Sequence, residues 1–535
     1  MNRITQDILT RAQRFQAAAP VLYGPNGQAL KRQSNISYQR KAARREGSMQ
    51  NWIPRRNYTR QAEAMERTRI VERSVDLVQS DPNAAGIVDH FATTVAGPGL
   101  YPEPSLDSDA LALDADILRR IQAQERAAYN TWFHYADAGW RMSFGEIQYL
   151  AQRNLLTYGE FIVLLPMIDD AARPYSLACM PIHPLRLHTP SDLMSRDDIR
   201  DGVELGDYGE PVAYWIQNAA TRYLTSLGNT SKNYTRVPAR QGHRWNVLHG
   251  YVQSDPDQVR GMPFFAPALK YFRDLNDYLD AELVSNVVTA AFSVFIETGS
   301  ADPLTVAQAM AHHTYADDDD NASDIRYEEL IPGAIMYGSA GQKPHAITAD
   351  RPGPTFGIFV KEIKKALAMS VNMPYVSLFH DVEETNYAGF RAAMLDAWRV
   401  FNYRREWLGN RFNGPIRTML LEEAWLRGDI PDIPDFYERM SAWASCQWIG
   451  TPKGNIEPIK EVQADILAID ARLKTRAQAN SERGNDWRRT FAQLAEEDAE
   501  ARGLALNGPD RSDPSDQSDQ TDQSEEEEEP DEQSD

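Results

Sequence analysis

The chain has 535 residues, of which 42% are hydrophobic and 25% are charged, which is typical of a soluble globular protein with roughly two to four structural units. Its two cysteines, Cys179 and Cys446, cannot form a disulfide framework or a structural zinc site, so we expect two reduced thiols. The net charge of −21 disfavours DNA binding over the whole surface, and the longest apolar run, Val287–Ile296, is too short to cross a membrane.

Charge is distributed unevenly along the chain. Residues 1–60 carry 12 Lys and Arg against 2 Asp and Glu, whereas residues 510–535 carry 13 acidic residues and one Arg. The basic N-terminal arm is either a mobile tail or, as Trp52 and Tyr58 favour, a segment that orders on a partner. The acidic C-terminal tail, 508–535, is predicted to be disordered because Ser, Asp, Gln and Glu dominate it. Any contact of such a chain with DNA is expected to be local or weak.

The first half of the chain combines helical and strand-like patterns. Apolar periodicity predicts helices at 61–78 and 83–95, followed by the helix-ending turn Gly97-Pro98-Gly99, and a helix pair within 109–158. Strand-like stretches follow at 161–166, 175–181, 211–217 and 247–252. The turn Asp207-Tyr208-Gly209 before the third stretch predicts a β-hairpin.

The second half is mainly helical, which predicts a mixed α/β, helix-rich fold. Helices are predicted at 264–296, 359–371, 386–412, 413–427, 455–480 and then on to Arg502. The first of these has apolar residues on more than one narrow stripe, at Phe272, Leu275, Leu279, Val284, Val288 and Phe292. Such a helix packs either inside one subunit or against neighbouring subunits, and the pattern fits both.

No motif for catalysis is evident. The stretch Gly450–Gly454 lacks the Gly-Lys-Ser/Thr ending of a phosphate-binding loop, and no Gly-x-Ser-x-Gly elbow is present. The four aspartates Asp317–Asp320 could bind Mg²⁺, but consecutive residues rarely point at one ion, and a solvated loop is favoured. His312 and His313 are adjacent rather than four residues apart, which disfavours zinc. We therefore expect no enzyme activity, no metal and no cofactor.

Several short motifs occur in a characteristic order over about residues 60–505. They are Arg73-Ser74-Val75-Asp76-Leu77-Val78, Asp81-Pro82-Asn83-Ala84-Ala85-Gly86, Gly97-Pro98-Gly99, Ala213-Tyr214-Trp215-Ile216, Arg236-Val237-Pro238-Ala239, Gln258-Val259-Arg260-Gly261-Met262-Pro263, Met373-Pro374-Tyr375, Asp381, Thr385-Asn386-Tyr387, Arg391, Glu457-Pro458-Ile459-Lys460-Glu461 and Gly484-Asn485-Asp486. As an ordered set they resemble the lambda-like family of phage portal proteins. Two stretches depart from the family pattern: Ala388-Gly389 stands where two serines are usual, and Ala471–Lys474 stands where a glycine is usual.

The resemblance implies a portal-type fold with wing, stem, clip and crown regions around a central tunnel. It implies a homo-oligomer, a dodecamer, that forms a ring at one capsid vertex of the virion and is assembled in the host cytoplasm. Double-stranded DNA would be packaged and ejected through the ring. The other partners implied are the large terminase, the major capsid or scaffold protein and head-completion or connector proteins, with no membrane.

The regions implied by the resemblance follow the predicted elements. They are a basic arm at 1–60, wing at 61–263, first stem helix at 264–297, clip at 298–354, second stem helix at 355–371, tunnel loop and following helix at 372–412, remaining wing and crown at 413–507, and acidic tail at 508–535.

The residues expected to face DNA flank the tunnel loop. They are Lys361, Lys364, Lys365, Asn386, Tyr387 and Arg391. A few cations against an acidic wall would give weak, salt-sensitive contacts that are blind to sequence, whereas the simpler alternative is solvated helix charges and one packed tyrosine. Two other functions stay open: a metal-dependent nucleic-acid enzyme using Asp317–Asp320, and a monomeric DNA-binding module using the basic arm.

Overall fold

The structure is a computed structural model that describes residues 60–218, 230–291, 294–297, 335–338, 356–454 and 457–503. Contacts divide the chain into Met1–Glu63 and Ala64–Asp535, and apart from the first turn of the first helix all described residues belong to the second unit. The basic arm, the His312-His313 pair, Asp317–Asp320 and the acidic tail lie outside the described residues.

The first two helices confirm the start and stop signals of the sequence. They are α2 (Arg60–Ser80) and α3 (Pro82–Val95). The Asp81 side chain accepts a hydrogen bond from Ala84 N at 2.7 Å, and Pro82 occupies the first turn of α3, where its missing N–H has no cost. Gly97 follows with φ +53°, a left-handed conformation that favours glycine and ends the helix.

An aromatic core lies beneath the next helices. α4 (Ser108–Leu111), α5 (Ala115–Phe133) and α6 (Phe144–Thr157) follow in sequence. Trp132 and Phe133 of α5 pack against Phe144 of α6, and Phe144 stacks on Phe412 from the far end of the chain. The strands β1 (Tyr101–Pro104) and β13 (Cys446–Ile449) pair antiparallel, so the two halves of the sequence share one core.

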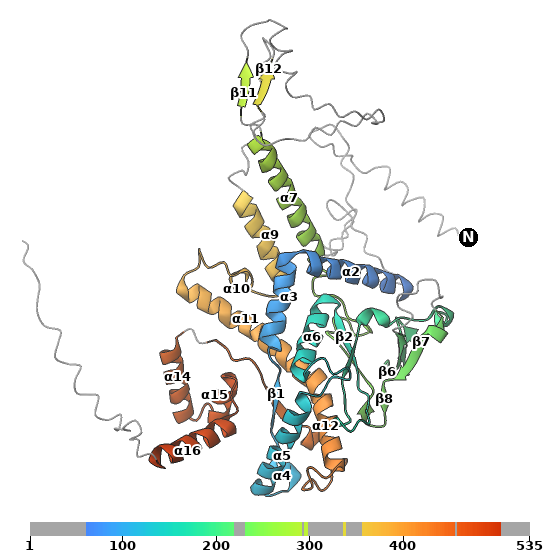
Figure 1. Ribbon diagram of the computed structural model, residues 1–535, viewed down its shortest axis with the longest axis vertical. Coiled ribbons are helices and arrows are strands. Elements are labelled where there is room, and N and C mark those ends of the chain that lie inside the picture. Colours follow the sequence, from blue (N-terminus) through green and yellow to red (C-terminus); the bar gives the residue numbers. More distant parts are fainter. Residues whose placement is uncertain are drawn as a thin grey trace, which may run out of the picture. The chain divides into compact units, whose positions relative to one another are not determined.

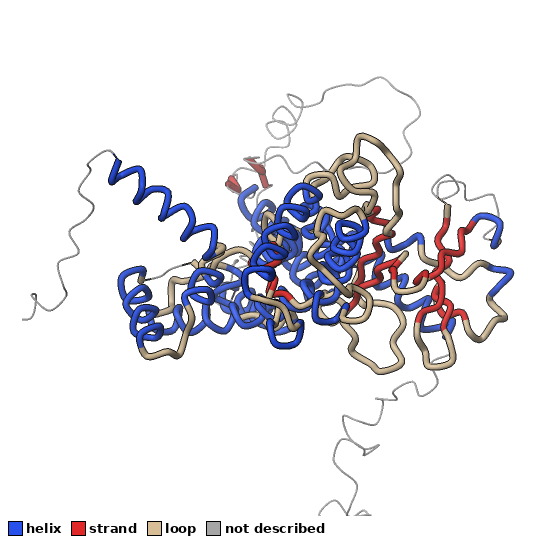
Figure 2. The backbone as a smooth tube through the Cα atoms, turned by 90° about the horizontal axis from the view of Figure 1, so that it is seen from below, coloured by secondary structure: helices blue, strands red, loops and turns tan. Residues whose placement is uncertain are grey.

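Two antiparallel sheets lie next to each other (Figure 2). One has the order β10-β2-β3 and the other β4-β5-β6-β7, and a two-stranded ribbon β8-β9 follows the second. Their bounds are β2 (Glu160–Leu164), β3 (Met180–Ile182), β4 (Ile199–Arg200), β5 (Val203–Leu205), β6 (Pro211–Gln217), β7 (Tyr234–Pro238), β8 (Arg240–Gln241), β9 (Arg244–Trp245) and β10 (Val247–Tyr251). The two sheets share a small core that includes Ile162, Ile182 and Ile216, and the predicted hairpin at Asp207-Tyr208-Gly209 is confirmed as β5–β6.

The predicted strand at 175–181 is wrong for most of its length, because β3 begins only at Met180. Side chains bind the backbone of the preceding segment instead. Glu423 accepts hydrogen bonds from Ser176 N and Leu177 N, and Trp132 Nε1 donates to Leu177 O at 2.7 Å. The segment therefore satisfies its backbone partly through side chains that are distant in sequence and partly through isolated backbone hydrogen bonds with Pro166 and Ile168, without a continuous strand before Met180.

The second half is helical, as expected, with two corrections. The helices are α7 (Leu269–Ala291), α9 (Phe356–Ser370), α10 (Tyr375–Phe379), α11 (Tyr387–Leu408), a π-helical turn (Gly409–Asn413), α12 (Gly414–Leu426), α13 (Met440–Trp443), α14 (Pro458–Asp470), α15 (Arg476–Glu482) and α16 (Trp487–Gly503). The helix predicted over 264–296 ends at Ala291, and β11 (Val294–Glu297) pairs parallel with β12 (Ile335–Gly338), as β-branched and aromatic residues favour. The helix predicted over 455–480 breaks into α14 and α15.

The pair α7 and α9 is anchored at one end and exposed at the other (Figure 1). Phe272 and Leu275 in the first part of α7 are fully buried, whereas Leu283 is 64% exposed. On α9, Leu367 is buried and Ile358 is 66% exposed. One part of the long helix therefore belongs to the subunit core, and the other part leaves apolar side chains uncovered in the single chain.

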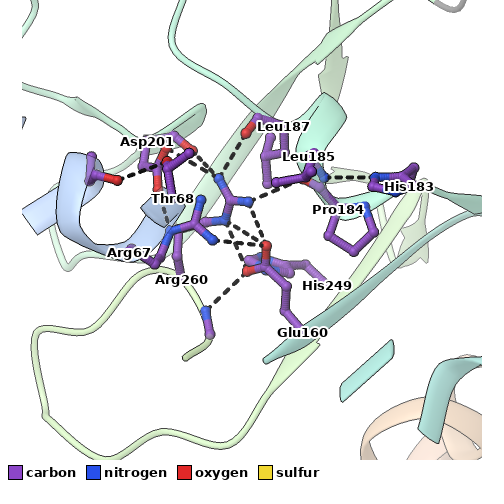
Figure 3. A network of polar contacts seen from close by, with 12 residues as sticks. Arg67, Thr68, Glu160, His183, Pro184, Leu185, Leu187, Asp201, His249 and Arg260 are labelled. Carbon is purple, nitrogen blue, oxygen red and sulfur yellow. Dashed lines mark hydrogen bonds and ion pairs between the residues drawn. The ribbon is translucent and has the colours of Figure 1, made fainter. Parts of the chain in front are cut away.

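A buried ion cluster includes the segment that leads into α7 (Figure 3). The Glu160 carboxylate is completely buried at the start of β2 and accepts hydrogen bonds from Arg260 Nε at 2.9 Å and from Gly261 N at 3.0 Å. His249 Nε2 of β10 lies 3.0 Å from Glu160 Oε2, and Arg67 Nε of α2 donates to Asp201 Oδ2 at 2.7 Å. The cluster thus joins α2, two sheets and the segment that leads into α7.

The electrostatics of the cluster favour a charged Glu160 carboxylate and a charged Arg260. Burial alone would raise the pKa of the Glu160 carboxyl, but Arg260 and Arg67 hold that pKa well below its usual range. Burial lowers the pKa of His249, against the opposing hydrogen bond to Glu160. Each charge therefore depends on its partners, because burial without them would be costly.

Two glycines allow this cluster to form. Gly159 has φ +86°, and a Cβ there would lie 2.6 Å from Met262 N. A Cβ on Gly261 would lie 2.0 Å from Gly159 O. The backbones before β2 and before α7 consequently approach more closely than any side chain permits.

We expect Glu160→Gln to lower the free energy of unfolding by about 3–5 kcal/mol, because Arg260 and Arg67 would remain buried without their shared carboxylate. Chemical denaturation of the dilute protein measures this change. The control is Asp116→Asn in the exposed i,i+3 pair with Arg119, for which the expected loss is about 0.5 kcal/mol or less. Equal losses of unfolding free energy in both variants would show that the Glu160 ion pairs contribute no more to stability than an exposed pair does.

Candidate functional site

The residues predicted to face DNA lie on α9, on α11 and beside the loop between α10 and α11, His380–Asn386, which we call the α10–α11 loop. α10 lies between the other two helices in sequence and contacts both (Figure 1). It ends at His380, whose φ is +54°. The loop contains three carboxylates, Asp381, Glu383 and Glu384. The local sequence therefore places acidic groups directly between the predicted cations.

On α9, the predicted lysines have partners within the subunit. Lys361 Nζ forms an ion pair with Glu384 and lies 3.9 Å from Asp381 Oδ2. Lys365 Nζ lies 2.6 Å from Glu362 Oε1 on the same helix. Lys364 Nζ lies 5.4 Å from the centroid of the Phe379 ring, and among the described residues no carboxylate lies within ion-pair distance of it. Lys364 is thus the lysine of this set whose charge is least compensated there.

Tyr375 and Asp381 fasten the start of the α10–α11 loop. Tyr375 Oη donates a hydrogen bond to Asp381 Oδ2 at 2.5 Å. Burial and this hydrogen bond raise the pKa of Tyr375 to about 12. The same hydrogen bond, together with Lys361, lowers the pKa of Asp381. The tyrosine stays a donor and the carboxylate stays charged at neutral pH, which keeps the contact intact.

On the far side of the loop, the predicted residues hold the start of α11. Asn386 is the N-cap of α11, and its Oδ1 accepts a hydrogen bond from Gly389 N at 2.8 Å. Arg391 Nη1 lies 3.0 Å from Glu457 Oε2. Lys460, Tyr387 and Arg391 together lower the pKa of Glu457. The structure thus brings Lys361 and Lys364 near the acidic loop, leaves Lys365 paired with Glu362 on its own helix, and joins Tyr387 and Arg391 to the start of α14.

Sequence reasoning missed the acidic partners as site residues. Tyr375, Asp381 and Glu457 lie in the motifs that carry the family resemblance, so that signal was present in the sequence. Their pairing was not visible, because Glu457 is 66 residues from Arg391 along the chain. The departure at Ala388-Gly389 does not disturb the cap, since Gly389 contributes only its backbone N–H.

The other chemical candidates lie apart from this loop or outside the described residues. Cys179 is fully buried, and burial raises the pKa of its thiol, so it is not a reactive thiolate. Burial also raises the pKa of Cys446. Within the described ranges, no three His, Cys, Asp or Glu side chains are placed to hold a metal ion. In the same ranges, no helix is both long and apolar enough to cross a membrane.

The chain belongs to the lambda family of phage portal proteins, since the family described as "Phage portal protein, lambda family" matches residues 45–405. This range includes the buried ion cluster and the α10–α11 loop. The resemblance stated from the motifs is thereby confirmed. The comparisons give no support to the alternative of a metal-dependent nucleic-acid enzyme.

Two portal proteins and one probable portal protein of phages are similar in sequence to this chain over most of its length. The portal protein of Escherichia phage N15 is 23% identical over 516 residues, covering 92% of this chain and 95% of the relative. Portal protein B of Escherichia phage lambda is 23% identical over 522 residues, covering 92% and 94%. A probable portal protein of Halomonas phage phiHAP-1 is 21% identical over 419 residues, covering 76% of each chain.

Solved structures show weaker likeness. A chain from the neck of a native GTA particle computed with C12 symmetry has a TM-score of 0.38 and 13% identity, covering 77% of this chain and 92% of that chain. A chain from the virion of a native gene transfer agent particle has a TM-score of 0.36 and 13% identity, covering 74% and 95%.

We expect Tyr375→Phe to speed hydrogen exchange at the backbone amides of the α10–α11 loop, because Asp381 would lose its hydrogen bond. Hydrogen–deuterium exchange read by mass spectrometry measures the change peptide by peptide. Peptides from β6 should exchange as in the wild type. The control is Tyr208→Phe at the exposed hairpin tip, where the side chain is 97% exposed. Unchanged exchange in the loop would show that Tyr375 does not hold it.

Proposed function

We propose that this portal protein assembles into a closed ring of identical copies, a dodecamer, whose axial channel conducts double-stranded DNA during packaging and ejection. The observation that carries the proposal is the helix pair α7 and α9, buried at one end and apolar but uncovered at the other. Leu283, Val284 and Val287 on α7 and Ile358 and Phe359 on α9 are between 49% and 66% exposed. Identical copies around an axis would cover such surfaces repeatedly.

The regions of a portal are assigned on this basis. α7 and α9 are the two stem helices, and residues 298–354 between them form the clip. Residues 61–263 form most of the wing. Residues 372–412 contain the tunnel loop and the helix behind it, and residues 413–507 complete the wing and form the crown. Membership of the portal family supports this division, as does the position of α7 and α9 within the matched range.

The partners follow from the same family membership. The ring would occupy one capsid vertex of the virion after assembly in the host cytoplasm, next to the major capsid or scaffold protein. The clip would dock the large terminase, and later the head-completion or connector proteins. The subunit itself would contribute no catalysis and would need no cofactor.

The residues proposed to face DNA remain those flanking the tunnel loop: Lys361, Lys364, Lys365, Asn386, Tyr387 and Arg391. Ion pairs with Glu384, Glu362 and Glu457 reduce the attraction of three of these cations for phosphate. A channel should hold DNA weakly enough for it to slide, and partly neutralised cations suit that requirement. Lys364 is the member of the set best placed to attract phosphate.

We expect Leu283→Asp to prevent or weaken ring formation without unfolding the subunit, since Leu283 is 64% exposed in the single chain. Mass photometry measures the particle mass against 60.5 kDa for one copy, and electron microscopy shows whether an axial hole is present. The control is Met194→Asp, an exposed apolar residue outside α7 and α9. A wild-type protein that remains a single chain in every buffer would refute the proposed ring.

We expect Lys364→Glu rings to bind double-stranded DNA about tenfold more weakly at low salt, because one charge contact is reversed in every copy of the ring. Ring formation should be unchanged, and the difference should shrink as salt rises. Filter binding or fluorescence anisotropy over a salt series measures this. The matched control is Lys270→Glu, an exposed lysine of α7 outside the predicted set. Equal losses in both variants would remove the tunnel assignment of Lys364.

A further inference from the structure

Arg404 of α11 is a partly buried cation with no anionic partner among the described residues. Its guanidinium carbon lies 4.3 Å from the centroid of the Phe264 ring and 5.3 Å from that of the Phe91 ring. Burial lowers its pKa to about 10, which still leaves the group charged at neutral pH. Two aromatic faces compensate part of that charge, because the π face is negative. No carboxylate or carbonyl oxygen within the described ranges accepts a hydrogen bond from it.

Several other buried or half-buried arginines among the described residues have oxygen atoms as partners. Arg260 and Arg417 pair with Glu160 and Glu125, respectively. The neighbour on α11, Arg405, donates to the carbonyl oxygens of Thr94 and Thr451 at 2.9 Å. Arg404 therefore lacks the kind of acceptor that the same chain provides to comparable side chains.

A cleft of about 350 Å³ opens at Arg404. Tyr403 and Trp407 of α11 line it, together with Val252 after β10, and Tyr403 is 65% exposed. Arginine, tyrosine and tryptophan are the residue types that dominate the binding energy of protein–protein contacts. The remaining cation of the cleft, Arg399, already has Asp396 as a partner at 3.8 Å. A groove for a nucleic-acid backbone would need several unpaired cations, and among the described residues this cleft offers a single one.

We propose that this cleft receives a carboxylate side chain from the adjacent copy of the chain, which pairs with Arg404. The inference rests on the proposed ring, and it names a contact between copies at a place other than the stem. The chain favours such a partner by charge, since it has 77 acidic residues and 56 Lys and Arg. Charged pairs of this kind select the register in which two surfaces dock. Because Arg404 lies on the helix that follows the α10–α11 loop, the contact would also fix that helix to the neighbouring copy.

Arg404→Met tests the proposal, since methionine retains an apolar side chain over the two rings and removes the charge. We expect the concentration at which rings dissociate, measured by mass photometry, to rise about tenfold or more. Arg404→Lys, which keeps the charge, should recover part of the loss. The matched control is Arg119→Met on α5, an exposed side chain outside the cleft that pairs with Asp116 on its own helix, and this variant should dissociate as the wild type does. Circular dichroism of the dilute variants reports whether the subunit is folded.

A photo-crosslinking amino acid at Tyr403 gives a second measurement that does not require Arg404 to be changed. In assembled rings we expect covalent dimers, with the crosslinked peptide of the second copy containing Asp or Glu. Crosslinks confined to one chain, or none at all in assembled rings, would overturn the proposal. Arg404→Met rings that form normally and lose only DNA would overturn it too, since the site would then bind phosphate. A wild-type chain that forms no ring would refute the proposed function itself. Arg404→Met rings that dissociate at the same concentration as wild-type rings would refute only this contact.

Discussion

The Glu160 carboxylate is the group on which the arrangement of this subunit depends. It is completely buried, and it is held as an anion by Arg260, by the backbone N–H of Gly261 and by His249. Because neither the carboxylate nor the arginines can remain buried alone, the elements that carry them must come together. Those elements are α2, β2, β10 and the segment that precedes α7, which supplies Arg260 (Figure 3).

The cations that were predicted to face DNA mostly have carboxylate partners within the subunit. Most of those that sequence reasoning assigned to the channel are partnered by nearby carboxylates, as Lys361 is by Glu384 and Arg391 by Glu457. A surface with compensated charges attracts DNA weakly, which suits a conduit better than a tight binding site. Lys364 and Arg404 differ from this pattern, since among the described residues both lie beside aromatic rings rather than in ion pairs, and the channel contact proposed for the first and the contact between copies proposed for the second both use that uncompensated charge.

The helices were predicted from the sequence better than the strands. Asp81-Pro82 marked the start of α3, since a capping side chain and a proline act over a few residues. The strand predicted at 175–181 begins only at Met180, and side chains from distant parts of the chain, Glu423 and Trp132, bind part of the backbone before it. In the candidate site, the sequence identified the cations Lys361 and Arg391 but not their carboxylate partners Glu384 and Glu457. The break between α14 and α15 follows from the Thr475 capping box and from Arg472, which has φ +58° in the stretch where the family usually has glycine.

The sequence by itself determined the helix-rich mixed α/β class, the turns and caps, and the family, since each depends on local patterns or on motifs in a given order. Only the tertiary structure decided that Glu160 is a buried anion, that α7 is half core and half uncovered, and that Arg404 has aromatic rings but no anionic partner among the described residues. Charge pairing and burial depend on which residues meet in space. Glu160 and Arg260 are 100 positions apart, and no periodicity in the sequence records that contact.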